Sequence, residues 1–143
     1  MKLNDECILN DFDVSLFLNL EELIIGNDCF ENVNLFKIDG LNHLICIKIG
    51  KNAFGNNKND YGRNTFRSFH ISNCNELKSI EIGLFSFSDY GGLFELKNLP
   101  SLSTIKIGEI GSWSCNFWSS SFVVKGIIDM ILLMNRSPTF EFD

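Results

Sequence analysis

Histidine and cysteine are the side chains best suited to acid–base, nucleophilic or metal chemistry, and this 143-residue chain contains few of them. The two histidines are His43 and His70, and neither lies near a serine, a cysteine or a carboxylate at a recurring catalytic spacing. A catalytic histidine needs such partners to orient the ring and to exchange its proton. We therefore expect both histidines to be exposed and solvated.

The cysteines are odd in number, scattered, and without a C-x-x-C pair: Cys7, Cys29, Cys46, Cys74 and Cys115. A disulfide framework or a zinc site needs paired or closer spacing. We expect reduced thiols, with Cys74 acting as a small core residue. Reduced thiols favour a cytoplasmic location; the alternative is the cell surface, as part of a longer protein.

Residues 56–62 are rich in oxygen donors but lack the alternating carboxylates and the distal glutamate of a calcium loop. The single glycines of the chain precede no expected helix and form no phosphate cradle. We therefore expect no metal, no cofactor and no catalytic activity. A hypothesis of an enzyme would need a deep pocket with perturbed acids, and no motif points to one.

The bulk properties exclude two classes of partner. A formal net charge of −6 argues against nucleic acid, because binding phosphates needs a basic stripe. The longest apolar run, 127–134, is interrupted by Asp129 and is far shorter than the ~20 residues of a membrane span. The first residues show no apolar signal-peptide core, so we expect no cleaved signal.

The sequence motifs expected to position the candidate side chains recur along the chain. An apolar–x–apolar–Gly tetrapeptide recurs at 23–26, 47–50, 80–83 and 105–108. An aromatic–x–aliphatic tripeptide precedes each copy and occurs once more at the end, at 12–14, 36–38, 69–71, 94–96 and 122–124. Units thus start near residues 12, 36, 69, 94 and 122. Such self-similarity is typical of a repeat protein.

Alternation of apolar and other residues in both motifs predicts two short strands per unit, each with one buried face. Stacked units would bury three columns, each contributed by one repeat position. The columns are Phe12, Phe36, Phe69, Phe94 and Phe122; Leu23, Ile47, Ile80 and Ile105; and Ile25, Ile49, Ile82 and Ile107. The sequence therefore predicts a mostly β solenoid with two parallel sheets. We expect the glycine that closes each tetrapeptide to have a positive φ.

We expect one domain over residues 1–143, with repeats over about 12–125, an N-terminal cap at 1–11 and a C-terminal cap at 126–143. Residues 126–136 suit a short helix as well as a strand.

The unit resembles the leucine-rich repeat over roughly residues 12–126. The residues that carry the resemblance are Leu41-x-x-Leu44-x-x-Ile47-x-Ile49-Gly50, Cys74-x-x-Leu77-x-x-Ile80-x-Ile82-Gly83 and Leu99-x-x-Leu102-x-x-Ile105-x-Ile107-Gly108. It is most similar to the irregular variety of BspA-like surface proteins. The resemblance implies a right-handed solenoid and a role in binding proteins. Glycine stands after the strand where that family has asparagine, the units vary in length, and a strand replaces the helix. A parallel β-helix is the alternative.

Two groups of side chains are candidates for binding. Lys48, Glu81 and Lys106 take outward positions on neighbouring strands, where they form either a solvated face or a recognition surface. Tyr61, Tyr90, Trp113 and Trp118 lie in loops, where aromatic residues either anchor partners or cover the core. The leading hypothesis is a non-catalytic protein-interaction scaffold. The alternative is a structural subunit that self-assembles end to end.

Overall fold

The computed structural model describes residues 1–6, 10–56, 63–109, 115–134 and 140–142, and within these ranges it is all-β with no helix. Two parallel sheets make up the molecule, as the sequence predicts. The six-stranded sheet consists of β1 (Lys2–Leu3), β2 (Glu22–Ile25), β4 (Cys46–Ile49), β6 (Ser79–Ile82), β8 (Thr104–Ile107) and β10 (Ile131–Met134). The five-stranded sheet consists of β3 (Leu35–Asp39), β5 (Ser68–Ser72), β7 (Leu93–Lys97), β9 (Ser121–Lys125) and β11 (Phe140–Phe142).

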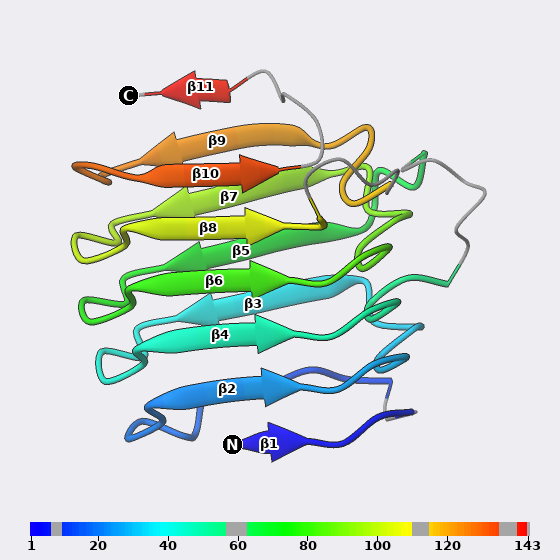
Figure 1. Cartoon of the computed structure of the whole chain (residues 1–143), viewed down its shortest axis with the longest axis horizontal. Coiled ribbons are helices and arrows are strands. Elements are labelled where there is room, and N and C mark those ends of the chain that lie inside the picture. Colours follow the sequence, from blue (N-terminus) through cyan, green and yellow to red (C-terminus); the bar gives the residue numbers. More distant parts are fainter. Residues whose placement is uncertain (7–9, 57–62, 110–114, 135–139, 143) are drawn as a thin grey trace.

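From β2 onward the chain alternates between the two sheets, and from β4 onward each strand pairs with the strand two positions earlier (Figure 1). Short turns connect the five-stranded sheet to the six-stranded sheet along one edge of the molecule. Longer loops return the chain along the opposite edge (Figure 1). The N-terminus and the C-terminus consequently lie at opposite ends of the stack of strands.

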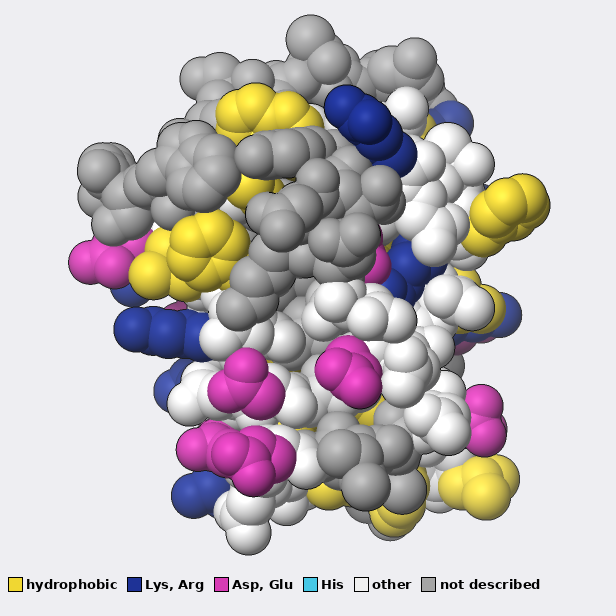
Figure 2. All heavy atoms as spheres, turned by 90° about the vertical axis from the view of Figure 1, so that its right-hand side faces the viewer, with side chains coloured by type: hydrophobic (Ala, Val, Ile, Leu, Met, Phe, Trp, Pro, Cys, Tyr) yellow, Lys and Arg dark blue, Asp and Glu magenta, His cyan; other side chains and the backbone are white. Residues whose placement is uncertain are grey.

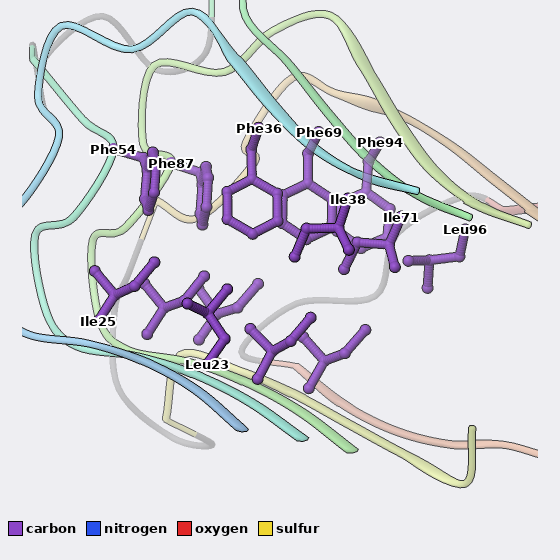
Figure 3. Close-up of a cluster of buried hydrophobic side chains, with 14 of the residues drawn as sticks. Leu23, Ile25, Phe36, Ile38, Phe54, Phe69, Ile71, Phe87, Phe94 and Leu96 are labelled. Atoms are coloured by element: carbon purple, nitrogen blue, oxygen red, sulfur yellow. The ribbon is translucent and has the colours of Figure 1, made fainter. Parts of the chain in front are cut away.

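The register of the sheets follows the sequence motifs. Ile47 pairs with Leu23 and Ile80, and Ile80 pairs with Ile105, so the second predicted column is confirmed. The third column, from Ile25 to Ile107, is aligned in the same way. Both columns are buried between the sheets, where they face the five-stranded sheet (Figure 3).

Phenylalanine rings form the centre of the core. The predicted column from Phe12 to Phe122 is confirmed: its neighbouring ring centroids are 4.5–4.8 Å apart and the rings are stacked. A second column runs beside it, with centroids 4.8–5.0 Å apart: Phe30, Phe54, Phe87 and Phe117. Rings of the two columns meet edge to face, as Phe69 and Phe87 do at 85° (Figure 3). Both arrangements are favourable for aromatic pairs.

Every residue of the second column has left-handed backbone, with φ between 48° and 57°. This conformation is uncommon for a bulky side chain and costs about 1–2 kcal/mol per residue. It turns the chain out of the six-stranded sheet while directing the ring back into the core, where these four rings are at most 2% exposed. Burial and stacking of the ring offset the strain.

The first predicted strand, at residues 12–14, is wrong. Phe12 stacks on Phe36, but the backbone of residues 12–14 is not a strand. The carboxylate of Asp13 accepts a hydrogen bond from the N–H of Ser15 at 2.9 Å. Such a local turn offers the backbone an alternative to a sheet ladder.

The predicted positive φ is wrong at Gly26, Gly50 and Gly83 and correct only at Gly108, where φ is 69°. These three glycines are needed for close approach instead. A Cβ at Gly83 would lie 2.6 Å from the carbonyl carbon of Gly50, and one at Gly50 would lie 2.7 Å from that of Gly26. Each glycine therefore lets the backbone of one turn pack directly on the turn before it.

The C-terminal segment extends both sheets. Ile131–Met134 forms β10, paired with β8, so the helix considered for this stretch is not formed. Phe140–Phe142 pairs with β9 as β11. At the other end, Lys2 and Leu3 of the expected N-terminal cap pair with β2.

We predict that Phe69→Ala lowers the free energy of unfolding by about 3–5 kcal/mol, because Phe69 is fully buried and contacts rings of both columns. Phe66→Ala is the matched control, since Phe66 is 89% exposed, and it changes stability by less than about 0.5 kcal/mol. Urea denaturation measures both. Equal losses for the two variants would contradict the stacked core.

We also predict that the protein tolerates asparagine at Gly40 but not at Gly83. Gly40→Asn is nearly neutral, because Gly40 has a φ of 73° with open space around it and Asn73 and Asn98 have the same left-handed φ in the corresponding turns. Gly83→Asn costs about 1–3 kcal/mol, because backbone atoms of Gly50 occupy the space for a Cβ. Thermal unfolding compares the variants. A tolerated Gly83→Asn would refute the close approach.

Candidate binding faces

Lys48, Glu81 and Lys106 form a row on the outer face of the six-stranded sheet. The register pairs Lys48 with Glu81 and Glu81 with Lys106, and all three side chains are exposed. Within the described ranges, none of them takes part in an ion pair of 4.0 Å or less. Positive and negative charges therefore alternate along the row as exposed side chains, without a close ion pair among the described residues.

An open groove of about 660 Å³ borders this row at the N-terminal end of the sheet. Its lining combines Lys2, Ile24 and Lys48 from adjacent strands with Asp5 and Asn27 from the loops. Apolar, cationic and anionic groups thus lie within one continuous surface.

The outer face of the five-stranded sheet carries a second row, Lys37, His70 and Glu95. His70 Nδ1 lies 3.2 Å from Glu95 Oε2, and the two side chains are 24% and 30% exposed. The expectation that His70 is exposed and solvated is wrong, because its neighbour in the register is a carboxylate. His43 is exposed as expected, with Nδ1 3.6 Å from Glu76 Oε1.

Sequence reasoning did not single out His70 and Glu95 as a pair. The signal was available, since each follows the phenylalanine of its unit by one residue, and equal positions become neighbours in a parallel register. This row lines a shallow groove of about 370 Å³ with Asp39, Ser72 and Lys97.

A chain of side-chain hydrogen bonds joins the turns that follow β3, β5 and β7, and it ends at Asp39. Asn73 Nδ2 and Ser72 Oγ each donate to Asp39 Oδ1 at 2.8 Å, and Asn98 Nδ2 donates to Asn73 Oδ1 at 3.0 Å. The bond from Asn73, followed by that from Ser72, holds the pKa of the Asp39 carboxyl below its ordinary value. Polar groups of this edge therefore pair with one another.

Tyr90 does not lie on the surface of its loop. Its side chain is fully buried, its hydroxyl donates to the carbonyl of Val33 at 2.6 Å, and its ring packs edge to face on Phe87. Trp118 is 40% exposed on the loop before β9. Tyr61 and Trp113 lie outside the described residues. The aromatic group is thus represented on the described surface by Trp118.

A buried arginine holds the loop edge together. Arg67 is 2% exposed; its guanidinium pairs with the carboxylate of Asp89 at 2.5 Å and donates to the carbonyls of Glu31 and Val33. It also lies over the Tyr90 ring, 4.8 Å from the centroid. A buried charge needs charged and polar partners of this kind. The edge faces the viewer in Figure 2, where Asp and Glu side chains gather in the lower half.

Among the described cysteines, Cys46, Cys74 and Cys115 have free thiols. Burial raises the pKa of the Cys74 thiol, which packs in the core as predicted. Among the residues that the structure describes, no three His, Cys, Asp or Glu side chains lie close enough together to bind a metal ion. No helix of the described residues is long and apolar enough to cross a membrane.

No protein-family model matches this chain, and neither a curated protein nor a solved structure matches it. The resemblance to leucine-rich repeats therefore rests on the residues of the chain itself.

Because the Tyr90 hydroxyl is buried, we expect the free energy of unfolding to fall at high pH. Desolvation raises the pKa of the Tyr90 hydroxyl well above its ordinary value, so folding favours the protonated form. The contribution is complete below the unfolded pKa of about 10 and is lost as pH rises beyond it. We predict that wild type loses more stability between about pH 8 and pH 11 than Tyr90→Phe does.

Urea denaturation at the two pH values measures this loss. At the lower pH, Tyr90→Phe is itself destabilised by about 1 kcal/mol, because the bond to Val33 is missing. Equal alkaline losses in wild type and Tyr90→Phe would show that the hydroxyl is not buried.

Proposed function

We propose that this chain is a leucine-rich-repeat-like solenoid that acts as a non-catalytic protein-interaction module, binding its partner on the outer face of the six-stranded sheet. The observation that carries the proposal is the exposed row of Lys48, Glu81 and Lys106, held in register by the parallel strands. The parallel β-helix is the alternative description of the same alternating strands.

The contrast between the two faces favours the six-stranded sheet. On the five-stranded sheet, His70 is paired with Glu95 and Asp39 accepts bonds from its neighbours. On the six-stranded sheet, the charges of the row extend into solvent without a close ion pair among the described residues. Exposed charges outside close ion pairs speed the encounter with a binding partner, and they determine which partner is accepted.

The regular spacing of the strands places the charges of this row at fixed positions. Neighbouring strands lie ~4.8 Å apart, so the row presents positive, negative and positive charge at regular intervals on a rigid surface. A protein surface with charges of opposite order fits this pattern. The groove beside Ile24 adds an apolar contact next to the row, and burial of apolar surface supplies affinity that exposed ion pairs do not.

Charge reversal on one face tests the proposal. We predict that Lys48→Glu/Lys106→Glu abolishes capture of a protein partner from source lysate that the wild type retains. The matched control is Lys37→Glu/Lys97→Glu, which changes net charge equally but on the opposite face, and it should retain the partner. Quantitative pull-down with mass spectrometry identifies what is lost.

Circular dichroism must first show that both double variants remain folded, which their exposed positions lead us to expect. Retention of every partner by Lys48→Glu/Lys106→Glu would exclude the six-stranded face. Loss with the control variant alone would assign binding to the five-stranded face. A cytoplasmic location and the absence of a cofactor remain predictions from the sequence.

A further inference from the structure

The groove on the outer face of the six-stranded sheet has a cation on each side of an apolar residue. The parallel register places Lys2 beside Ile24 and Ile24 beside Lys48, on the adjacent strands β1, β2 and β4 (Figure 1). The two lysines are exposed, and Ile24 is half-buried between them. All three side chains line the same open groove of about 660 Å³.

Glycine keeps the surface low beside these three residues. Gly26 follows Ile24 by two residues, Gly50 follows Lys48 by two, and both glycines line the groove. A Cβ at Gly26 would lie 2.6 Å from the carbonyl carbon of Asn4, and one at Gly50 would lie 2.7 Å from that of Gly26. The close packing of the turns, which excludes side chains at these positions, thus leaves the outer surface beside the row open.

The carboxylate within the groove is already engaged. Asp5 Oδ1 accepts a hydrogen bond from the N–H of Asn27 at 2.7 Å. Among the residues that the structure describes, neither Lys2 nor Lys48 forms an ion pair of 4.0 Å or less. Glu22, also on the outer face of β2, does not line the groove. Both ammonium groups therefore extend into solvent without a close carboxylate among the described residues.

The groove is positive on a chain that is negative overall. The net charge of −6 repels an acidic partner from most of the surface, whereas Lys2 and Lys48 attract it locally. The attraction ends at the next position of the row, because Glu81 follows Lys48 in the register. A nucleic acid is a poor fit, since its phosphates need a longer basic stripe and offer nothing apolar to Ile24.

We propose that this groove binds an extended acidic segment of the partner protein, with the pattern acidic–x–apolar–x–acidic; this rests on the function proposed for the outer sheet face. Alternate side chains of an extended chain face the same side. The central apolar residue packs on Ile24, and the two carboxylates reach Lys2 and Lys48. The lysines are about 10 Å apart across two strand spacings and the carboxylates about 13 Å apart along the segment, a difference that the long lysine side chains accommodate.

A short peptide tests the chemistry of this segment. The probe is acetyl-Gly-Glu-Ser-Leu-Ser-Glu-Gly-amide, titrated into the isotope-labelled chain and followed by two-dimensional NMR of the backbone amides. Saturable shift changes should gather at Ile24, Gly26, Lys48 and Gly50, which line the groove. Replacing both glutamates of the probe with glutamine should weaken binding about threefold to tenfold, because two exposed ion pairs are lost.

Variants of the chain assign the contacts. Lys2→Gln/Lys48→Gln should weaken binding of the glutamate peptide about threefold to tenfold and leave the weaker binding of the glutamine peptide unchanged, a difference that a general structural change would not produce. Ile24→Thr keeps a β-branched residue in the strand and should weaken both peptides about equally, because an apolar contact is lost. The matched control is Lys37→Gln/Lys97→Gln on the opposite face, which should bind as the wild type does.

Three results would overturn the acidic segment: no saturable shifts at millimolar peptide, shifts confined to the five-stranded sheet, or equal binding of the glutamate and glutamine peptides. The pull-down separates this failure from failure of the proposed function. If Lys48→Glu/Lys106→Glu loses the partner while the wild type does not bind the peptide, the outer face stands and the occupant of the groove is wrong. If that variant retains every partner, the proposed function fails, and the acidic segment fails with it.

Discussion

Stacking of phenylalanine rings in two adjacent columns is the interaction on which the rest of the structure depends. Rings within a column are 4.5–5.0 Å apart, which matches the ~4.8 Å spacing of paired strands. In-register parallel pairing and ring stacking therefore require the same geometry, and each reinforces the other. The edge-to-face contacts between columns, such as Phe36 with Phe54 at 87°, tie the two sheets into one core.

This tight stacking constrains the backbone at the edges of the sheets. Phe54 and Phe87 reach the core only because their backbone is left-handed, and Gly50 and Gly83 allow the turns above and below to touch. The short turns satisfy the same spacing with a column of left-handed residues, in which Asn73 and Asn98 also hydrogen-bond to the turn before them. Strain and close approach are thus confined to positions where the stacked core repays them.

Because the core is made by inward positions alone, the outward positions lie on the outer faces of the sheets. The row of Lys48, Glu81 and Lys106 contributes little to stability as exposed charges, and for this reason we propose it as the surface that binds a partner. The loop edge is different. Arg67 and Tyr90 lie inside it and join the loops after β2, β4 and β6 through the carbonyl of Val33. Tyr90 therefore belongs to the core, and our proposal places binding on a sheet face instead.

The sequence by itself determined the strands from β2 to β9, their parallel register and the first ring column, since these follow from side chains repeated at fixed spacing and each prediction depends only on local periodicity. Tertiary structure alone decided two other matters. Gly83 is required because the backbone of Gly50 lies against it rather than because of its own φ, and Tyr90 turns inward because Arg67 and Val33 meet it there. Each depends on which atoms distant segments bring together, and a pattern along one chain does not contain those distances.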